Sequence, residues 1–181
     1  MFKRISLGAI VAVAIMFMPY VAQAQSIGVV DVQKILQTTA AGKNIHDQLE
    51  SKRKAYQKEI SSKETSLRKL EKSILDEKAN LSEDEFNEKR KEFEQEVLKT
   101  QKIVQNNKRS LEAGFTNGLA KLRDEVRTSI EVIAKERNFD MVISQENVII
   151  AQPSMDITDA VIKALDKRVS KVDIDWSAPK N

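Results

Sequence analysis

Helical periodicity dominates the middle of the chain. From residue 42 to residue 79 there is no proline and no glycine beyond Gly42, and apolar residues recur three, four or seven positions apart. This spacing is typical of a helix that packs along one face against another helix. The apolar positions of this first helix are Leu49, Tyr56, Ile60, Leu67, Leu70, Ile74 and Leu81.

A second helix is predicted after a short polar turn near residue 80. Ser82 and Glu85 have the spacing of a capping box, and Glu83 and Asp84 fall in the first turn, where the helix dipole favours anions. Because the connection is short, the two helices must be antiparallel, with lengths of about 55 and 80 Å. The second apolar series runs to about residue 137, through Phe86, Phe93, Val97, Val104, Leu111, Phe115, Leu119, Leu122, Val126, Ile130 and Ile133.

Short β-branched segments flank this hairpin. Residues 27–32 predict one strand, and residues 141–151 predict two strands around a turn at residues 145–147. A helical hairpin returns its ends to one place, so these strands are expected to form a sheet of at least three strands, covered by an amphipathic helix over residues 157–169. The fold class is therefore α+β. The strand residues expected in the body core are Ile27, Val29, Val30, Val142, Ile143, Val148, Ile149 and Ile150.

Such a body supplies few apolar side chains, and the chain has no cysteine to staple it. We therefore expect a symmetric oligomer whose sheets pack together or join edge to edge. The expected division is residues 25–41 for the first part of the body, 42–112 for the helical arm and 113–170 for the arm base and the rest of the body. Residues 171–181 form a tail that is either disordered or an added edge segment.

The N-terminus predicts export. Lys3 and Arg4 precede a stretch of about 14 apolar residues, and Ala22 and Ala24 form a small-x-small cleavage site. As a helix this stretch spans about 21 Å, which is too short for a membrane anchor. We expect residues 1–24 to be a signal peptide cleaved near Ala24, and the protein to be periplasmic. The absence of cysteine excludes a lipid-modified N-terminus.

Charge is distributed unevenly along the arm. Without the signal the chain has 28 basic and 27 acidic residues, so its overall charge does not favour nucleic acid. Residues 52–72 carry a net charge of +5, residues 89–109 carry +4, and the tip at residues 76–88 carries −5. With the tip near residue 80, residues whose numbers sum to about 161 face each other across the two antiparallel helices. The two basic stretches are then expected to lie side by side. The candidate binding residues for acidic cargo or anionic lipid are Lys52, Arg53, Lys63, Arg68, Lys69, Lys72, Lys89, Arg90, Lys91, Lys99 and Lys102.

Two glycines interrupt the second helix. Gly114 and Gly118 predict a hinge where the arm meets the body, since glycine costs about 1 kcal/mol relative to alanine inside a helix. Close packing at these positions is the alternative. His46 is the single histidine, and we interpret it as a surface residue rather than a metal ligand.

Both ends of the chain resemble the Skp (OmpH) family of periplasmic chaperones. The resemblance is carried by IGVVDVQKIL and TAAGKNIHDQLE near the start, and by NFDMVISQENVIIA and MDITDAVIKALD near the end. It implies a homotrimer in which the strands form a β-barrel body and three helical arms enclose a cavity. It also implies that unfolded outer-membrane proteins are held there without ATP. Family members are markedly basic, whereas this chain is nearly neutral without its signal.

Two classes of function fit these patterns. The first is an ATP-independent holdase for unfolded outer-membrane proteins, with a possible contact to anionic lipid or lipopolysaccharide through the basic shaft. The second is a structural or adaptor protein of the envelope that uses its coiled-coil arms to reach a specific partner. No nucleophile and base can be paired around one histidine, and there is no P-loop, so we expect neither an enzyme nor a cofactor.

Overall fold

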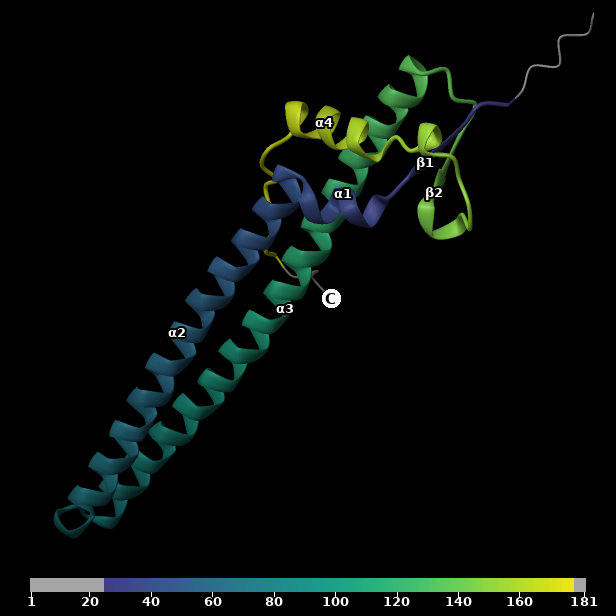
Figure 1. Cartoon of the computed structure of the whole chain (residues 1–181). Helices are drawn as coiled ribbons and strands as arrows, with labels where there is room; N and C mark the ends of the chain where they lie inside the picture. Colours follow the sequence, from purple (N-terminus) through teal and green to yellow (C-terminus); the bar gives the residue numbers. More distant parts are fainter. Residues whose placement is uncertain (1–24, 178–181) are drawn as a thin grey trace, which may run out of the picture.

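Two long antiparallel helices run the length of the molecule (Figure 1). The computed structural model describes residues 25–177, so the predicted signal peptide lies outside the described residues. Helix α2 is Ala40–Glu77, a 3-10 turn η1 covers Lys78–Asn80, and helix α3 is Glu83–Glu136. The predicted helical hairpin with its tip near residue 80 is confirmed. No helix among residues 25–177 is long and apolar enough to cross a membrane.

Side-chain caps define where the helices begin. The Ser82 hydroxyl accepts from the Glu85 backbone N–H, and the Glu85 carboxylate accepts from the Ser82 backbone N–H, so the predicted capping box is present. A short helix, α1 (Val32–Thr38), precedes α2 and is capped by Asp31. Thr39 then caps α2. A Cβ atom at Gly42 would lie 2.0 Å from the Leu36 carbonyl oxygen, so the sharp turn from α1 into α2 requires glycine there.

The sheet differs from the prediction in its strand number. It has two strands, β1 (Ile27–Val30) and β2 (Met141–Ser144), and they pair in parallel with Ile27 opposite Met141. Residues 148–151 form no strand, so the predicted second strand of that hairpin and the three-stranded sheet are wrong for the single chain. Two 3-10 turns, η2 (Gln145–Asn147) and η3 (Pro153–Met155), occupy this connection instead.

The path of the chain after β2 explains the missing strand. Asp156 forms a parallel bridge with Val29, and the Ile157 backbone N–H donates to the Val29 carbonyl oxygen at 2.9 Å. Val29 is also in register with Ile143 of β2, so Asp156 must lie on the other edge of β1. The segment between β2 and Asp156 therefore passes from one edge of the sheet to the other through the turns η2 and η3, and it does not pair with β2.

The core lies where the two long helices meet the short elements. Helix α4 (Thr158–Arg168) buries Val161 and Leu165, and it packs mainly against α1 and α3 rather than over the two strands as predicted. Arg168 of α4 bonds to Glu125 and Ser129 of α3, which fixes this contact at its edge. The buried apolar cluster comprises Val30, Ile35, Ala41, Ile45, Leu122, Val126, Ile133, Ile157, Val161, Leu165, Val172 and Ile174.

Candidate binding surfaces on the arm and its base

The six candidate basic residues of α2 project from the arm without acidic partners. Lys52 is half-buried, while Arg53, Lys63, Arg68, Lys69 and Lys72 are exposed. Within residues 25–177, none of the six forms an ion pair with a carboxylate. Lys52 lies over the Tyr56 and Trp176 rings, and the other five side chains are exposed to solvent.

The candidate residues of α3 are partly neutralised. Lys89 pairs with Glu77, Arg90 with Glu94, and Lys99 with Glu96. Lys91 and Lys102 are exposed and form no ion pair with a described carboxylate. The basic character of the arm is thus concentrated on α2.

The pairing of the two arm helices is shifted from the prediction. The contacts Tyr56–Ser110, Glu59–Asn107 and Glu77–Lys89 all join residues whose numbers sum to 166 rather than 161. The turn residues 78–82 are 3-10 or extended and rise further per residue than an α-helix, so fewer residues are needed on the α2 side of the tip.

This shift changes the charge opposite α2. Residues 52–72 face residues 94–114, in which Lys99, Lys102, Lys108 and Arg109 stand against Glu94, Glu96 and Glu112, a net charge of +1 rather than +4. Residues 89–91 lie beside the acidic tip instead. The two strongly basic stretches are therefore not directly opposed.

The acidic tip is held together by hydrogen bonds to its carboxylates. The Lys89 ammonium and the Ser73 hydroxyl both donate to Glu77, and together they hold the pKa of Glu77 below its ordinary value. The Ser82 hydroxyl and backbone N–H lower the pKa of Glu85 in the same way. The tip is therefore a fixed, ionised turn.

Very little is buried along the rest of the arm. We call residues 50–109 the outer arm and the remaining described residues the base. Within the outer arm only Ile74 and Thr100 are buried, although apolar residues recur along both helices. Leu75 and Leu98 are 63% and 64% exposed. The two helices touch along a narrow seam.

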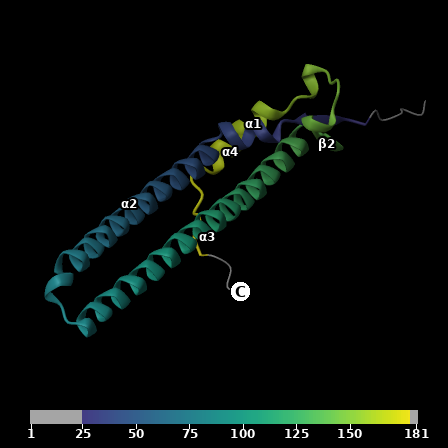
Figure 2. The ribbon, with the colours of Figure 1, turned by 90° about the horizontal axis from the view of Figure 1, so that it is seen from below.

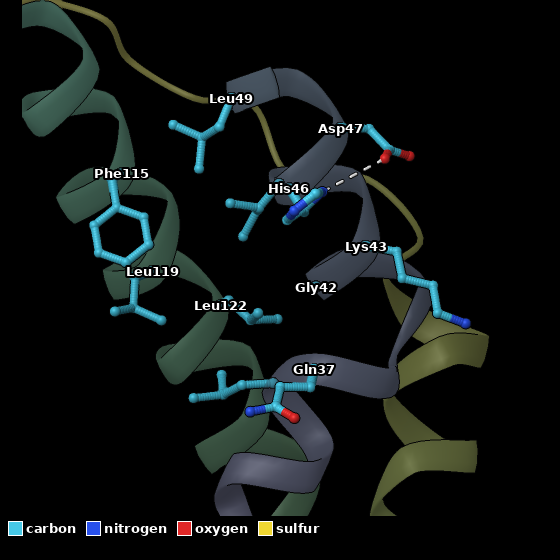
Figure 3. Close-up of a pocket in the computed structure, with 11 residues that line it drawn as sticks. Gln37, Gly42, Lys43, His46, Asp47, Leu49, Phe115, Leu119 and Leu122 are labelled. Carbon is cyan, nitrogen blue, oxygen red and sulfur yellow. Dashed lines mark ion pairs between the residues drawn. The ribbon is translucent and has the colours of Figure 1, made fainter. Parts of the chain in front are cut away.

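An apolar pocket of about 480 Å³ opens at the base, between α1, α2 and α3. Leu49, Phe115, Leu119 and Leu122 form its apolar wall, and His46 lies at its rim beside Asp47 (Figure 3). His46 is exposed, and no cluster of three or more potential metal ligands occurs within residues 25–177. Phe115 and Leu119 belong to the apolar series predicted for the second helix, but that spacing does not indicate a pocket.

Residues 171–177, which we call the C-terminal strap, were the least predictable part of the base. The strap runs in an extended conformation from the end of α4 across α2 and α3 (Figure 2). Val172 and Ile174 are buried, and Trp176 packs beside α3. The only sequence signal was the alternation of Val172, Ile174 and Trp176 with two aspartates.

The strap also explains the two glycines of α3. A Cβ atom at Gly114 would lie 2.5 Å from the Trp176 ring, and one at Gly118 would lie 3.3 Å from the Ile174 side chain. Both glycines are buried inside an uninterrupted helix, which supports the alternative of close packing. The hinge stays a prediction.

The expected body core divides into buried and exposed parts. Val29 and Val30 are buried, and Ile27, Val142, Ile143 and Val148 are half-buried. Ile149 and Ile150 are 100% and 90% exposed. Within residues 25–177 this segment belongs to no strand, and these two isoleucines are the most exposed large apolar side chains.

Comparisons with known proteins agree with this architecture. The family model described as outer membrane protein (OmpH-like) matches residues 26–165. A crystal structure from Caulobacter crescentus CB15, of a protein described as an OmpH-like outer membrane chaperone, has a TM-score of 0.79 and 22% identity. The match covers 84% of this chain and 90% of that chain, and at this identity it shows a shared fold. No curated protein matches. The strap follows the region that the family model covers.

Proposed function

This chain belongs to the OmpH-like family, and from that premise we propose that it is an ATP-independent holdase chaperone of the periplasm. It binds unfolded outer-membrane proteins between helical arms and prevents their aggregation before membrane insertion. It carries out no catalysis and needs no cofactor. The observation that carries this proposal is the outer arm, where unpaired basic side chains on α2 accompany an apolar seam that is mostly unburied.

Electrostatic capture explains the basic residues. A surface lined by one sign of charge raises the local concentration of chains of the opposite sign. Arg68, Lys69 and Lys72 form a cluster on α2, and Lys63 lies about one turn and a half away from it. An acidic unfolded chain would be attracted along this surface, while half-buried and exposed apolar residues of the arm would contact its apolar segments.

An oligomer is needed for several arms to surround one cargo chain. The exposed Ile149 and Ile150 support association through the body, because adjacent large apolar side chains on a surface are typical of sites where chains associate. We propose a homotrimer whose bodies join through this segment into a shared barrel. Replacing both isoleucines with aspartate is expected to give a monomer by mass measurement, and a trimer that persisted would contradict this arrangement.

An anionic lipid or lipopolysaccharide contact is the second binding role that the shaft supports. Lys69, Lys72 and Lys91 form no ion pair with a described carboxylate, whereas Lys89 and Arg90 are paired. Co-sedimentation with vesicles containing one-third anionic lipid is expected to depend on Lys69 and Lys72. Binding that is equal for neutral and anionic vesicles would remove this role.

The test of the proposed function is an aggregation assay without nucleotide. A urea-denatured β-barrel membrane protein is diluted into buffer with the protein, and light scattering is followed. We expect suppression at about one oligomer per cargo chain. No suppression would contradict the holdase and favour the envelope adaptor.

A charge-reversed variant tests how the cargo is bound. Replacing Lys63, Arg68, Lys69 and Lys72 with glutamate is expected to weaken cargo binding at least tenfold at low salt, with a smaller difference at high salt. The matched control reverses Lys43, Arg127, Lys163 and Lys167, which are exposed residues of the base. Equal affinity of the two variants at low salt would contradict electrostatic capture by α2.

A further inference from the structure

The C-terminal strap occupies a groove whose walls bond to its backbone. Asn44 and Gln48 of α2 bond to Val172, with the Asn44 side-chain oxygen 3.1 Å from the backbone nitrogen and the Gln48 side-chain nitrogen 2.8 Å from the carbonyl oxygen. The Lys121 ammonium of α3 donates to the Asp173 carbonyl oxygen at 2.7 Å. Two elements of the hairpin thus bond to the start of the strap.

The same pattern continues to the end of the strap. The Asn117 side-chain oxygen accepts from the Asp175 backbone N–H at 3.1 Å, and the Ser110 hydroxyl donates to the Trp176 carbonyl oxygen at 2.8 Å. Among the described residues, every hydrogen bond between the groove and the strap uses a backbone atom of the strap. Any extended segment offers these same backbone groups.

Alternate side chains of the strap enter the groove. Val172 and Ile174 are 5% and 9% exposed, and Trp176 stacks over the place where Gly114 lacks a side chain. Lys52 also lies over the Trp176 ring, 5.5 Å from its centre. Asp173 and Asp175, in contrast, are exposed. The groove therefore takes up apolar side chains at alternate positions of the strap and leaves the polar side chains between them in solvent.

Backbone hydrogen bonds combined with apolar contacts at alternate side chains are the features of sites that bind extended peptides. We propose that this groove is a second binding site, for extended segments with alternating apolar and polar residues, and that the strap fills it until such a segment displaces it. The inference rests on the proposed function for the source of the segments, because strands of outer-membrane barrels alternate in this way.

Because the strap is covalently joined to α4, it competes strongly with any free segment for the groove. A short tether gives an effective concentration in the millimolar range, so an isolated short peptide must bind tightly to replace the strap. A long unfolded chain that is already held by the outer arm gains the same advantage. The groove would therefore admit a free peptide only at about millimolar concentrations, and captured cargo at lower ones.

Displacement of the strap can be measured through Trp176, the single tryptophan of the chain. The probe is a tryptophan-free peptide of twelve residues that alternates isoleucine or valine with serine or aspartate. The control peptide has the same composition with its apolar residues in one block. We expect the alternating peptide to shift Trp176 emission to the red in a saturable manner, and the control to bind at least tenfold more weakly.

Two variants test whether the peptide binds in the groove. Binding of a fluorescein-labelled peptide to each is measured by fluorescence anisotropy. Ile174→Asp releases the strap and is expected to tighten peptide binding at least tenfold, because the competitor is gone. Gly118→Phe fills the groove and is expected to abolish peptide binding, while Gly118→Ala is its control. If Ile174→Asp unfolds the protein, Gly114→Ala replaces it, since its new methyl group would lie 2.5 Å from the Trp176 ring and 3.2 Å from the Ile174 side chain, both of which belong to the strap.

The outcomes separate this inference from the proposed function. Peptide binding that leaves Trp176 emission unchanged, or that is equal in the Ile174→Asp and Gly118→Phe variants, would overturn the groove as a peptide site. If aggregation is suppressed but the strap never leaves, the holdase stands and this inference fails. If the peptide displaces the strap but cargo still aggregates, the groove stands and the proposed function fails.

Discussion

The base and the outer arm are built from the same two helices, yet they are packed very differently. In the base, α2 and α3 are surrounded by α1, α4 and the strap, and all buried apolar residues except Ile74 lie there. In the outer arm, beyond the contact of Lys52 with Trp176, each helix has only the other as a neighbour (Figure 1). Two helices alone cannot enclose a core, so the outer arm depends on the base for its stability.

One chain thus combines a packed base with a loosely packed arm surface. Segments with few buried contacts open at a lower free energy than the packed core. An arm of this kind can separate locally and still return to register, because the capping box and the Glu77–Lys89 pair define its tip.

The largest contrast is expected from leucine truncations. Leu165→Ala removes a side chain that is fully buried in the base, and it should lower the free energy of unfolding by about 2–5 kcal/mol. Leu98→Ala in the outer arm removes a side chain that is 64% exposed, and it should change that free energy by about 0.5 kcal/mol or less. Urea denaturation followed by circular dichroism measures both. Similar losses would show that the outer arm has a core of its own.

A glycine substitution should produce the next largest effect. At Gly42 a methyl group would meet the Leu36 carbonyl oxygen, so Gly42→Ala must separate α1 from α2, at a cost of about 1–3 kcal/mol that improved helix propensity offsets in part. The matched control is Gly118→Ala, where the nearest atoms are side-chain atoms at 3.3 Å or more and the net change should be close to zero. Equal melting temperatures for the two variants would refute the tight turn at Gly42.

Removal of the tip cap should act locally. Ser82→Ala deletes one half of the capping box, which typically costs about 1 kcal/mol. Because the tip is remote from the core, hydrogen exchange should accelerate in residues 78–90, while the global urea midpoint changes little. A large shift of that midpoint would mean that arm and base unfold as one unit.

The smallest effect should come from acid. The pKa values of Glu77 and Glu85 are lowered by their hydrogen bonds, so the native state favours the ionised carboxylates. The ionised carboxylates contribute their full stability to the folded tip when the pH is above the ordinary glutamate pKa of about 4.3. This contribution is lost as the pH falls through the lowered pKa values of the folded state. Exchange at the tip, corrected for intrinsic rates, should therefore rise below about pH 4. The Glu77→Gln variant should show a smaller rise, and an identical rise would exclude Glu77 as a cause.

The sequence predicted the features that depend on neighbouring residues, and it did not predict those that depend on distant ones. The hairpin and the Ser82–Glu85 cap depend on residues close together in the chain, so their patterns were sufficient. The pairing register depended on the rise of five turn residues, which no pattern reports. The parallel pairing of β1 with β2 and the unpaired Ile149 and Ile150 depend on how distant segments meet.

The candidate site shows the same limit. The basic residues of α2 were predictable from the sequence. Their lack of ion pairs within residues 25–177 was not, because it depends on where the acidic side chains of both helices lie. The strap was missed because five polar side chains from two helices bond to its backbone, and backbone groups are the same in every sequence. Gly114 and Gly118 were visible in the sequence, but their packing partners lie about 60 residues away.

Hydrogen exchange along the whole chain, with and without an unfolded outer-membrane protein, would show whether the outer arm is loosely packed and binds cargo. Without cargo, residues 50–109 should exchange at least a hundredfold faster than the buried amides of α4 and of α3 beyond residue 118. With cargo, protection should rise in the outer arm and remain unchanged in the base. Equal protection of arm and base in the free protein, or an outer arm that does not respond to cargo, would contradict the account.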